Sequence, residues 1–124
     1  MDRIWLKHYP AGVAASVPAD RYASLQQLFD QCFAQHAARP AFRCMGRSYS
    51  FGDIDAASRA LAASLQALGL QRGERVALML PNVPQYAVAV AAVLRAGLVL
   101  VNVDPLYTPR ELEHQLKDSG AQAI

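Results

Sequence analysis

The chain has 124 residues, of which 53% are hydrophobic and 18% are charged. This balance is typical of one soluble globular domain and excludes a disordered or fibrous chain. Twelve Lys and Arg residues against ten Asp and Glu residues give a formal net charge of +2, without a run of one sign. The nearest basic group, Arg39, Arg43 and Arg47, is expected on a solvated hairpin. The charge pattern therefore indicates no nucleic-acid partner.

The cysteines, the N-terminus and the apolar stretches bear on location. Cys32 and Cys44 lack metal-ligand spacing and are expected to be buried, reduced thiols of a cytosolic protein. The first ten residues mix charged with apolar side chains, unlike a secretory signal. Arg95 divides the apolar stretch from Tyr86 to Val103, so it is too short to span a membrane. We expect a cytoplasmic protein.

Residues 1–21 carry two prolines and a glycine and show no sustained period, which predicts an irregular arm. We expect the arm to lie over the domain, with Trp5 and Tyr9 as its anchors. Residues 22–124 should form the α/β unit.

A helix is expected to begin at Ser24, where Gln27 completes a capping box. Its apolar positions repeat at helical spacing until the chain reaches Pro40. These positions are Leu25, Leu28, Phe29, Cys32, Phe33 and His36. Residues 41–51 then alternate around Met45 and Gly46, which predicts a small β-hairpin.

A second helix is predicted from the capping pair Ser50 and Asp53 to Gly69. Asp55 and Arg59 lie four residues apart and are expected on its outer face. The inward positions are Ile54, Ser58, Leu61, Leu65 and Leu68. Since Ser58 has no neighbouring base, we interpret it as a small packing residue and not as a nucleophile.

The next segments predict a βαβ unit: a strand at 75–80, a helix from Pro84 to Ala96, and a strand at 98–101. Apart from Arg75, both strands are continuous apolar runs, which is typical of a parallel sheet covered on both faces by helices. The fold class is therefore α/β, with helices flanking a parallel sheet and a small hairpin near the N-terminus.

Thr108, Pro109 and Glu111 carry the signals of a helix N-terminus, and Gly120 should end this helix. Leu112 and Leu116 are expected to face inward, and Glu113 should pair with Lys117. Residues 121–124 resemble the start of another strand, so we expect the pattern to continue beyond this sequence.

Ligands of open parallel sheets gather beyond the C-terminal ends of the strands, which makes Asn82, Asp104 and Tyr107 the candidate substrate-binding residues. Structural roles compete with this interpretation, because Asn82 can cap a helix and Asp104 can begin a turn. The sequence has no glycine-rich phosphate loop after a strand, and no nucleophile with an adjacent base. The three histidines fall on different predicted elements. We therefore expect no catalytic, cofactor-binding or metal-binding residue in this chain.

The segments WLKHYPAGV, SLQQLFDQ, RPAF, GDIDAASRALAASLQALGLQRGERVALMLPNVPQY and RAGLVLVNVDPLYTPRELEHQLKDSGA cover nearly the whole chain. They resemble the N-terminal region of bacterial long-chain fatty-acid–CoA ligases. RGERVALMLPN through RAGLVLV resembles adenylate-forming enzymes at large, whereas the WLKHYP arm and DPLYTPRELEHQLKDSGA resemble the fatty-acyl branch. One departure is Asp104, where fatty-acyl members commonly carry Asn.

This resemblance implies that residues 22–124 are the N-terminal α/β portion of the large domain of such a ligase. The implied reaction joins ATP and a fatty acid in an acyl-adenylate with release of pyrophosphate, and coenzyme A then displaces AMP. Mg²⁺ would assist at the phosphates. The family's phosphate loop, nucleotide contacts, fatty-acid tunnel and catalytic lysine lie beyond this sequence, so the chain alone should be inactive and bind no cofactor.

Two alternatives stay open at this point: a ligase for aryl or short acids, and a non-catalytic α/β binding module. The implied partners are the remainder of the ligase polypeptide and, through it, small-molecule substrates. The parent could lie peripherally on the inner membrane. Apolar surface left uncovered should make the isolated chain self-associate.

Overall fold

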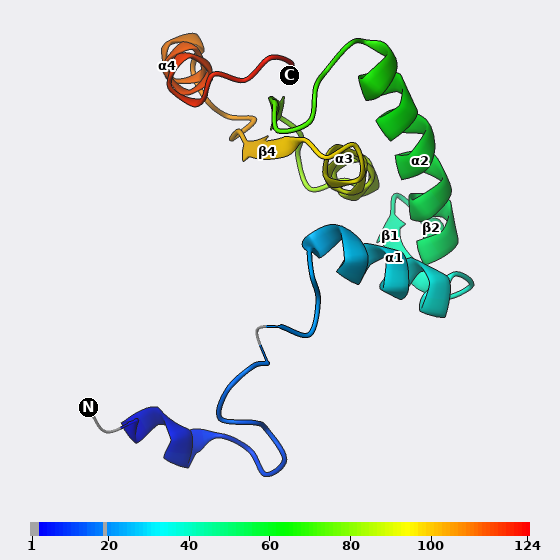
Figure 1. Ribbon diagram of the computed structural model, residues 1–124, viewed down its shortest axis with the longest axis vertical. Helices are drawn as coiled ribbons and strands as arrows, with labels where there is room; N and C mark the ends of the chain where they lie inside the picture. The colour runs from blue at the N-terminus through cyan, green and yellow to red at the C-terminus, as the bar shows by residue number, and fades with distance from the viewer. Residues whose placement is uncertain (1–2, 19) are drawn as a thin grey trace.

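The computed structural model describes residues 3–18 and 20–124. A curved α/β body follows a thin N-terminal arm that leads away from it (Figure 1). In chain order the elements are the 3₁₀ helix η1 (Ile4–His8), α1 (Leu25–His36), β1 (Pro40–Cys44), β2 (Arg47–Ser50), α2 (Phe51–Ala67), β3 (Arg75–Leu78), α3 (Pro84–Arg95), β4 (Val99–Asn102) and α4 (Pro109–Ser119).

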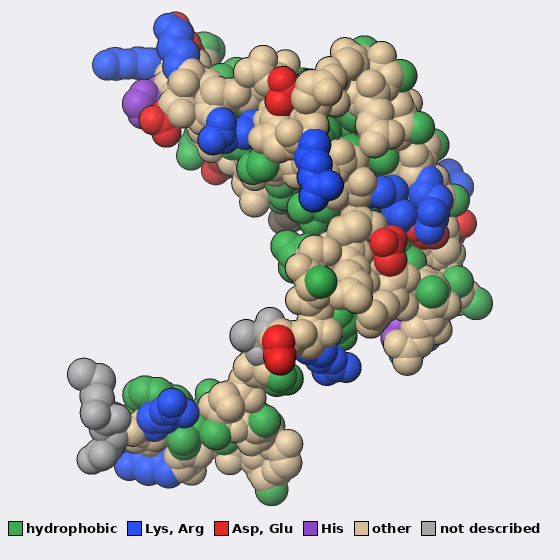
Figure 2. Space-filling model, viewed as in Figure 1, with side chains coloured by type: hydrophobic (Ala, Val, Ile, Leu, Met, Phe, Trp, Pro, Cys, Tyr) green, Lys and Arg blue, Asp and Glu red, His purple; other side chains and the backbone are tan. Residues whose placement is uncertain are grey.

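The arm does not lie over the domain, as the ribbon and the space-filling view both show (Figure 1 and Figure 2). Trp5 and Tyr9 remain 49% and 43% exposed, and no residue of η1 is buried. The expectation that these two aromatic side chains anchor the arm is therefore wrong. Their apolar rings have no tightly packed surroundings to enter, since this segment leads away from the body (Figure 1).

Local hydrogen bonds set the start of α1 and the hairpin turn. The Ser24 hydroxyl accepts a hydrogen bond from the Gln27 amide at 3.1 Å, as predicted. The Gln27 side chain accepts from the Ala23 amide, one residue before the position that a capping box requires. β1 and β2 pair antiparallel around Met45 and Gly46, whose φ angles of 49° and 77° suit a two-residue hairpin turn.

The predicted apolar stripes of α1 and α2 extend too far. Leu25 is 60% exposed and Leu68 is 77% exposed, because both lie at helix ends where no neighbouring element covers them. Within α2, Ser58 is fully buried, and its hydroxyl donates to the Asp55 carbonyl oxygen at 2.8 Å. The interpretation of Ser58 as a small packing residue is confirmed.

α2 begins with the predicted capping box, in which the Ser50 hydroxyl accepts from the Asp53 amide and the Asp53 carboxylate accepts from the Ser50 amide. α4 repeats this arrangement with Thr108 and Glu111, and Gly120 ends the helix in the left-handed conformation.

β3 and β4 are parallel neighbours, in register from Arg75 opposite Val99 to Leu78 opposite Asn102. On the other side of β3, Ala123 forms a parallel bridge with Val76, and its carbonyl oxygen accepts from the Ala77 amide at 2.8 Å. The predicted strand start at the end of the sequence is thus confirmed. The fold class is α/β, although each strand ends at a slightly different residue from the one predicted.

Helix α3 is central to the packing. On one side Ala89 and Val93 pack with buried side chains of β3 and with Leu98, and on another side Ala91 packs with Phe33 of α1 and Ile54 of α2. Cover is incomplete at β4, where Val99 is 44% exposed. The expectation that helices cover both faces of the sheet is therefore met only in part.

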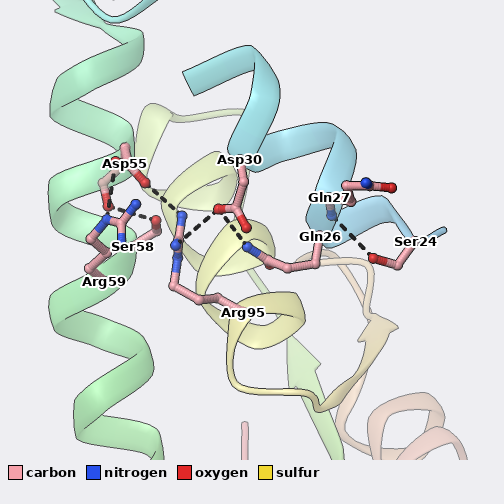
Figure 3. Close-up of polar contacts among 8 residues, drawn as sticks. All are labelled: Ser24, Gln26, Gln27, Asp30, Asp55, Ser58, Arg59 and Arg95. Carbon is pink, nitrogen blue, oxygen red and sulfur yellow. Dashed lines mark hydrogen bonds and ion pairs between the residues drawn. The ribbon is translucent and has the colours of Figure 1, made fainter. Parts of the chain in front are cut away.

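An ion-pair network joins α1, α2 and α3 (Figure 3). The Arg95 guanidinium lies 2.6 Å from Asp55 of α2 and 3.1 Å from Asp30 of α1. Asp55 also pairs with Arg59 at 3.1 Å, which is consistent with their spacing of four residues. The expected outer-face position of Asp55 is wrong, because its carboxylate faces α3 and is only 23% exposed.

Two further observations bear on the sequence expectations. Cys32 and Cys44 are free thiols but only half-buried, so full burial was predicted wrongly. Among residues 3–18 and 20–124, no helix is long and apolar enough to cross a membrane.

Candidate functional site

The candidate site lies at the edge of the sheet where β3 and β4 end. The parallel register brings both C-terminal ends to this edge, and the Val103 amide extends the pairing by donating to the Leu78 carbonyl oxygen at 3.1 Å. The chain then turns away from the sheet after each strand.

Asn102 is the polar centre of this edge. The Tyr86 hydroxyl of α3 donates to the Asn102 side-chain oxygen at 2.6 Å, and the Gln115 side-chain NH₂ group of α4 donates to the Asn102 backbone carbonyl oxygen at 2.7 Å. One residue thus joins the end of β4 to two helices. None of these three residues was predicted from the sequence as part of the site, although a single asparagine after an apolar run was an available signal.

The three residues predicted from the sequence have different surroundings. Asn82 is exposed and caps no helix, because Val83 is the N-cap residue of α3 and makes no side-chain cap bond. The Asp104 carboxylate accepts from the Leu106 amide at 2.9 Å, which is its predicted turn role. Tyr107 follows in the same turn and is 39% exposed. Within the described part of the chain, no side-chain hydrogen bond joins Asn82 to the other two.

Two carboxyl groups with a lowered pKa lie at helix N-termini, one in α2 and one in α4. Hydrogen bonds from the Ser50 amide and then the Ser50 hydroxyl lower the pKa of Asp53. Hydrogen bonds from the Thr108 hydroxyl and then the Thr108 amide lower the pKa of Glu111. Both shifts follow from capping, since a bond to the ionised form favours that form. They identify no acid or base for catalysis.

The described residues do not fit a nucleotide or its Mg²⁺. Among residues 3–18 and 20–124, no three His, Cys, Asp or Glu side chains are grouped to hold a metal ion. The Tyr86 hydroxyl and the Gln115 side-chain NH₂ group are already bonded to Asn102, and Gln115 Oε1 is buried without a hydrogen-bond partner among the described residues. An amide oxygen is an acceptor and offers no donor to a phosphate. We derive no reaction step through ATP or Mg²⁺ at these residues.

A groove of about 600 Å³ opens beside Asn82. Its walls come from α1, the hairpin, and the first turns of α2 and α3, and they are mostly aliphatic and aromatic. Arg43 and Asn82 are the polar exceptions, together with the Tyr86 hydroxyl, which is bonded to Asn102. The groove can hold an apolar group and has little to offer a charged one.

Residues 29–124 match the family of AMP-binding enzymes. The chain belongs to this family. Similar curated proteins include the long-chain-fatty-acid–CoA ligases of Yersinia pestis and Haemophilus influenzae, with 56% and 50% identity over the whole of this chain. The 4-coumarate–CoA ligase 5 of Oryza sativa is 40% identical over 78% of this chain. The chain spans only 22% of the length of the bacterial ligases.

Solved structures agree with the family assignment. The N-terminal subdomain of Klebsiella oxytoca NpsA superposes with a TM-score of 0.77 at 25% identity, covering 82% of this chain and 27% of that one. A fused adenylation di-domain containing NpsA gives a TM-score of 0.76 at 26% identity over 79% of this chain and 19% of that one. The α/β arrangement of this chain is therefore that of part of an adenylation N-terminal subdomain.

Proposed function

We propose that this chain is the N-terminal portion of a long-chain fatty-acid–CoA ligase. The parent enzyme would join ATP and a fatty acid in an acyl-adenylate, release pyrophosphate, and form the thioester when the coenzyme A sulfur displaces AMP. The observation that carries the proposal is identity of 50–56% to bacterial long-chain-fatty-acid–CoA ligases over the full chain. Residues 1–21 would be an arm, and residues 22–124 part of the large domain.

In this proposal the chain contributes no group to the chemical steps, and its main role is structural. Arg95 holds α1 and α2 against α3, and Asn102 holds α3 and α4 at the end of β4. Rigid placement of these elements would support the groups that position ATP and the acid in the remainder of the polypeptide, because small displacements at a reacting centre slow catalysis strongly.

A chimera tests this role. The chain replaces the matching region of the Yersinia pestis ligase, and pyrophosphate release and acyl-CoA formation are measured with ATP, Mg²⁺, a long-chain acid and coenzyme A. We expect an active chimera and no pyrophosphate above the blank for the chain alone. Protein-dependent release by the chain alone, or an inactive but folded chimera, would contradict the proposal.

The alternative ligase for aryl or short acids has one observation in its favour, the 40% identity to 4-coumarate–CoA ligase 5. The chimera cannot decide this point, because its substrate pocket would come from the Yersinia enzyme. The gene beyond Ile124 decides whether a ligase follows: a glycine-rich Ser/Thr loop supports one, and a stop codon leaves a non-catalytic module. Assaying the complete protein across acid chain lengths then separates fatty from aryl substrates.

The role of Asn82, Asp104 and Tyr107 as substrate contacts stays a proposal. In the chimera, Asn82→Ala and Tyr107→Phe should raise KM for one substrate without changing the far-ultraviolet circular dichroism. Unchanged KM values for ATP, acid and coenzyme A in both variants would leave these residues a structural role only.

We propose a cytoplasmic parent that lies peripherally on the inner membrane, and an isolated chain that self-associates through exposed apolar surface. Fractionation of cells that express the complete protein tests the first point, and a purely periplasmic protein would contradict it. Sedimentation and a hydrophobic dye test the second. A dye-silent monomer at all concentrations would show that the chain covers its own core.

A further inference from the structure

We propose that the apolar groove between α1, the hairpin and α3 is the docking surface for an apolar segment of the ligase polypeptide that follows this chain. This inference rests on the proposed function and adds where and by what chemistry the two parts meet.

The groove is built from elements that the fold holds firmly. Phe29 and Phe33 of α1 lie on one wall, and their rings are 5.9 Å apart. Phe42 of β1 contributes to the lining and remains 41% exposed. Ala87 and Val90 of α3 complete the apolar lining. The capping of α1 by Ser24 and the pairing of β1 with β2 hold two of these walls in place.

The lining selects an apolar occupant. Arg43 and Asn82 are the only lining side chains with polar groups free of a hydrogen bond or ion pair in the described part of the chain, besides the two thiols. Both residues are exposed, so a charged ligand buried among the aliphatic and aromatic side chains of the groove would lose its hydration without compensating bonds. Aliphatic and aromatic protein side chains would instead gain from burial.

The extent of the polypeptide favours the remainder of the ligase as the occupant. The curated relatives are several times longer than this chain, which spans 22% of their length. Monomeric proteins rarely leave a large contiguous apolar surface open, so a complete ligase would be expected to cover this groove. A second copy would need a surface complementary to the groove on this same short chain.

The two cysteines of the chain provide a direct probe. Cys32 on α1 and Cys44 at the end of β1 both line the groove, and both are free and half-buried. A segment seated in the groove would shield both thiols from a reagent in solution. Their reactivity therefore reports whether the groove is covered.

The experiment compares thiol modification in the chain alone and in the Yersinia chimera, in which the cysteines contributed by the Yersinia segment are replaced by Ser. We expect both groove thiols to react with a maleimide at least tenfold more slowly in the chimera. Phe42→Ser should restore part of the reactivity in the chimera, whereas Met45→Ser, on the 97% exposed turn of the same hairpin, should not. Circular dichroism of the variants checks that they remain folded.

Equal reactivity in the chain and the chimera would overturn the proposal. Protection in the chimera that appears only at high protein concentration would assign the groove to a second copy, and protection of the isolated chain by added palmitate would assign it to a hydrocarbon ligand. Either result would also overturn it. An active chimera with unprotected thiols contradicts docking alone, whereas protected thiols in an inactive chimera contradict the proposed function alone.

Discussion

Arg95→Met should destabilise the chain by about 2 kcal/mol, because it removes the cation shared by α1 and α2. The Arg95 side chain is 14% exposed, and its carboxylate partners Asp55 and Asp30 are 23% and 46% exposed. A hydrogen bond to a charged group contributes about 1.5–3 kcal/mol, which applies to the short contact with Asp55. The half-exposed Asp30 pair adds at most about 1 kcal/mol.

A compensating effect keeps the expected loss of stability near the lower end of the sum of these two contributions. The Arg95 Nε atom is buried without a hydrogen-bond partner among the described residues, so part of the dehydration cost disappears with the guanidinium. Met retains much of the aliphatic stem and limits the loss of packing.

Urea denaturation of both proteins measures the difference, with Arg59→Met as the matched control. Arg59 is 61% exposed and pairs with Asp55 four residues away, so its loss should cost no more than about 0.5 kcal/mol. High salt should reduce this small effect and leave most of the Arg95 effect. Equal losses of stability for the two variants would refute the conclusion that Arg95 stabilises the packing of α1 and α2 on α3.

Three other perturbations follow from single features of the fold. Because capping lowers the folded-state pKa of Asp53 and Glu111 below their usual values of 3.8 and 4.5, their stabilisation is present at neutral pH and lost as the pH falls. A D53N/E111Q variant should therefore show a shallower loss of stability from about pH 5 to about pH 3, and an unchanged slope would contradict the capping explanation. Val93→Ala, at a position 1% exposed, should lower the free energy of unfolding by about 2 kcal/mol, as measured by urea denaturation. Leu68→Ala, at a position 77% exposed, is the control. Equal losses for the two variants would show that the core around Val93 is loosely packed. Met45→Asn should raise the thermal midpoint slightly, since Asn tolerates the positive φ of 49° better than Met, and a lower midpoint would place the Met side chain in a stabilising contact.

Features set by neighbours in the sequence could be predicted without the structure. The capping boxes at Ser50 and Thr108 and the turn at Met45 and Gly46 each satisfy hydrogen bonds within a few residues. The order of strand, helix and strand could be predicted because the apolar residues form continuous runs in the two strands and repeat at helical spacing between them. The parallel pairing followed from the length of the crossover, since a helix between two strands returns the chain to the same end of the sheet.

The groove and the polar centre at Asn102 could not be predicted in this way, because each depends on which faces of distant elements meet. Asp55 has the spacing of a surface residue, yet it faces Arg95, forty residues away in the sequence. Asn102 bonds to Tyr86 and Gln115 only because α3 and α4 both reach the end of β4. Periodicity determines which side of a helix is apolar, but the exposure of each side chain depends on where the helices cross and how far their contact extends.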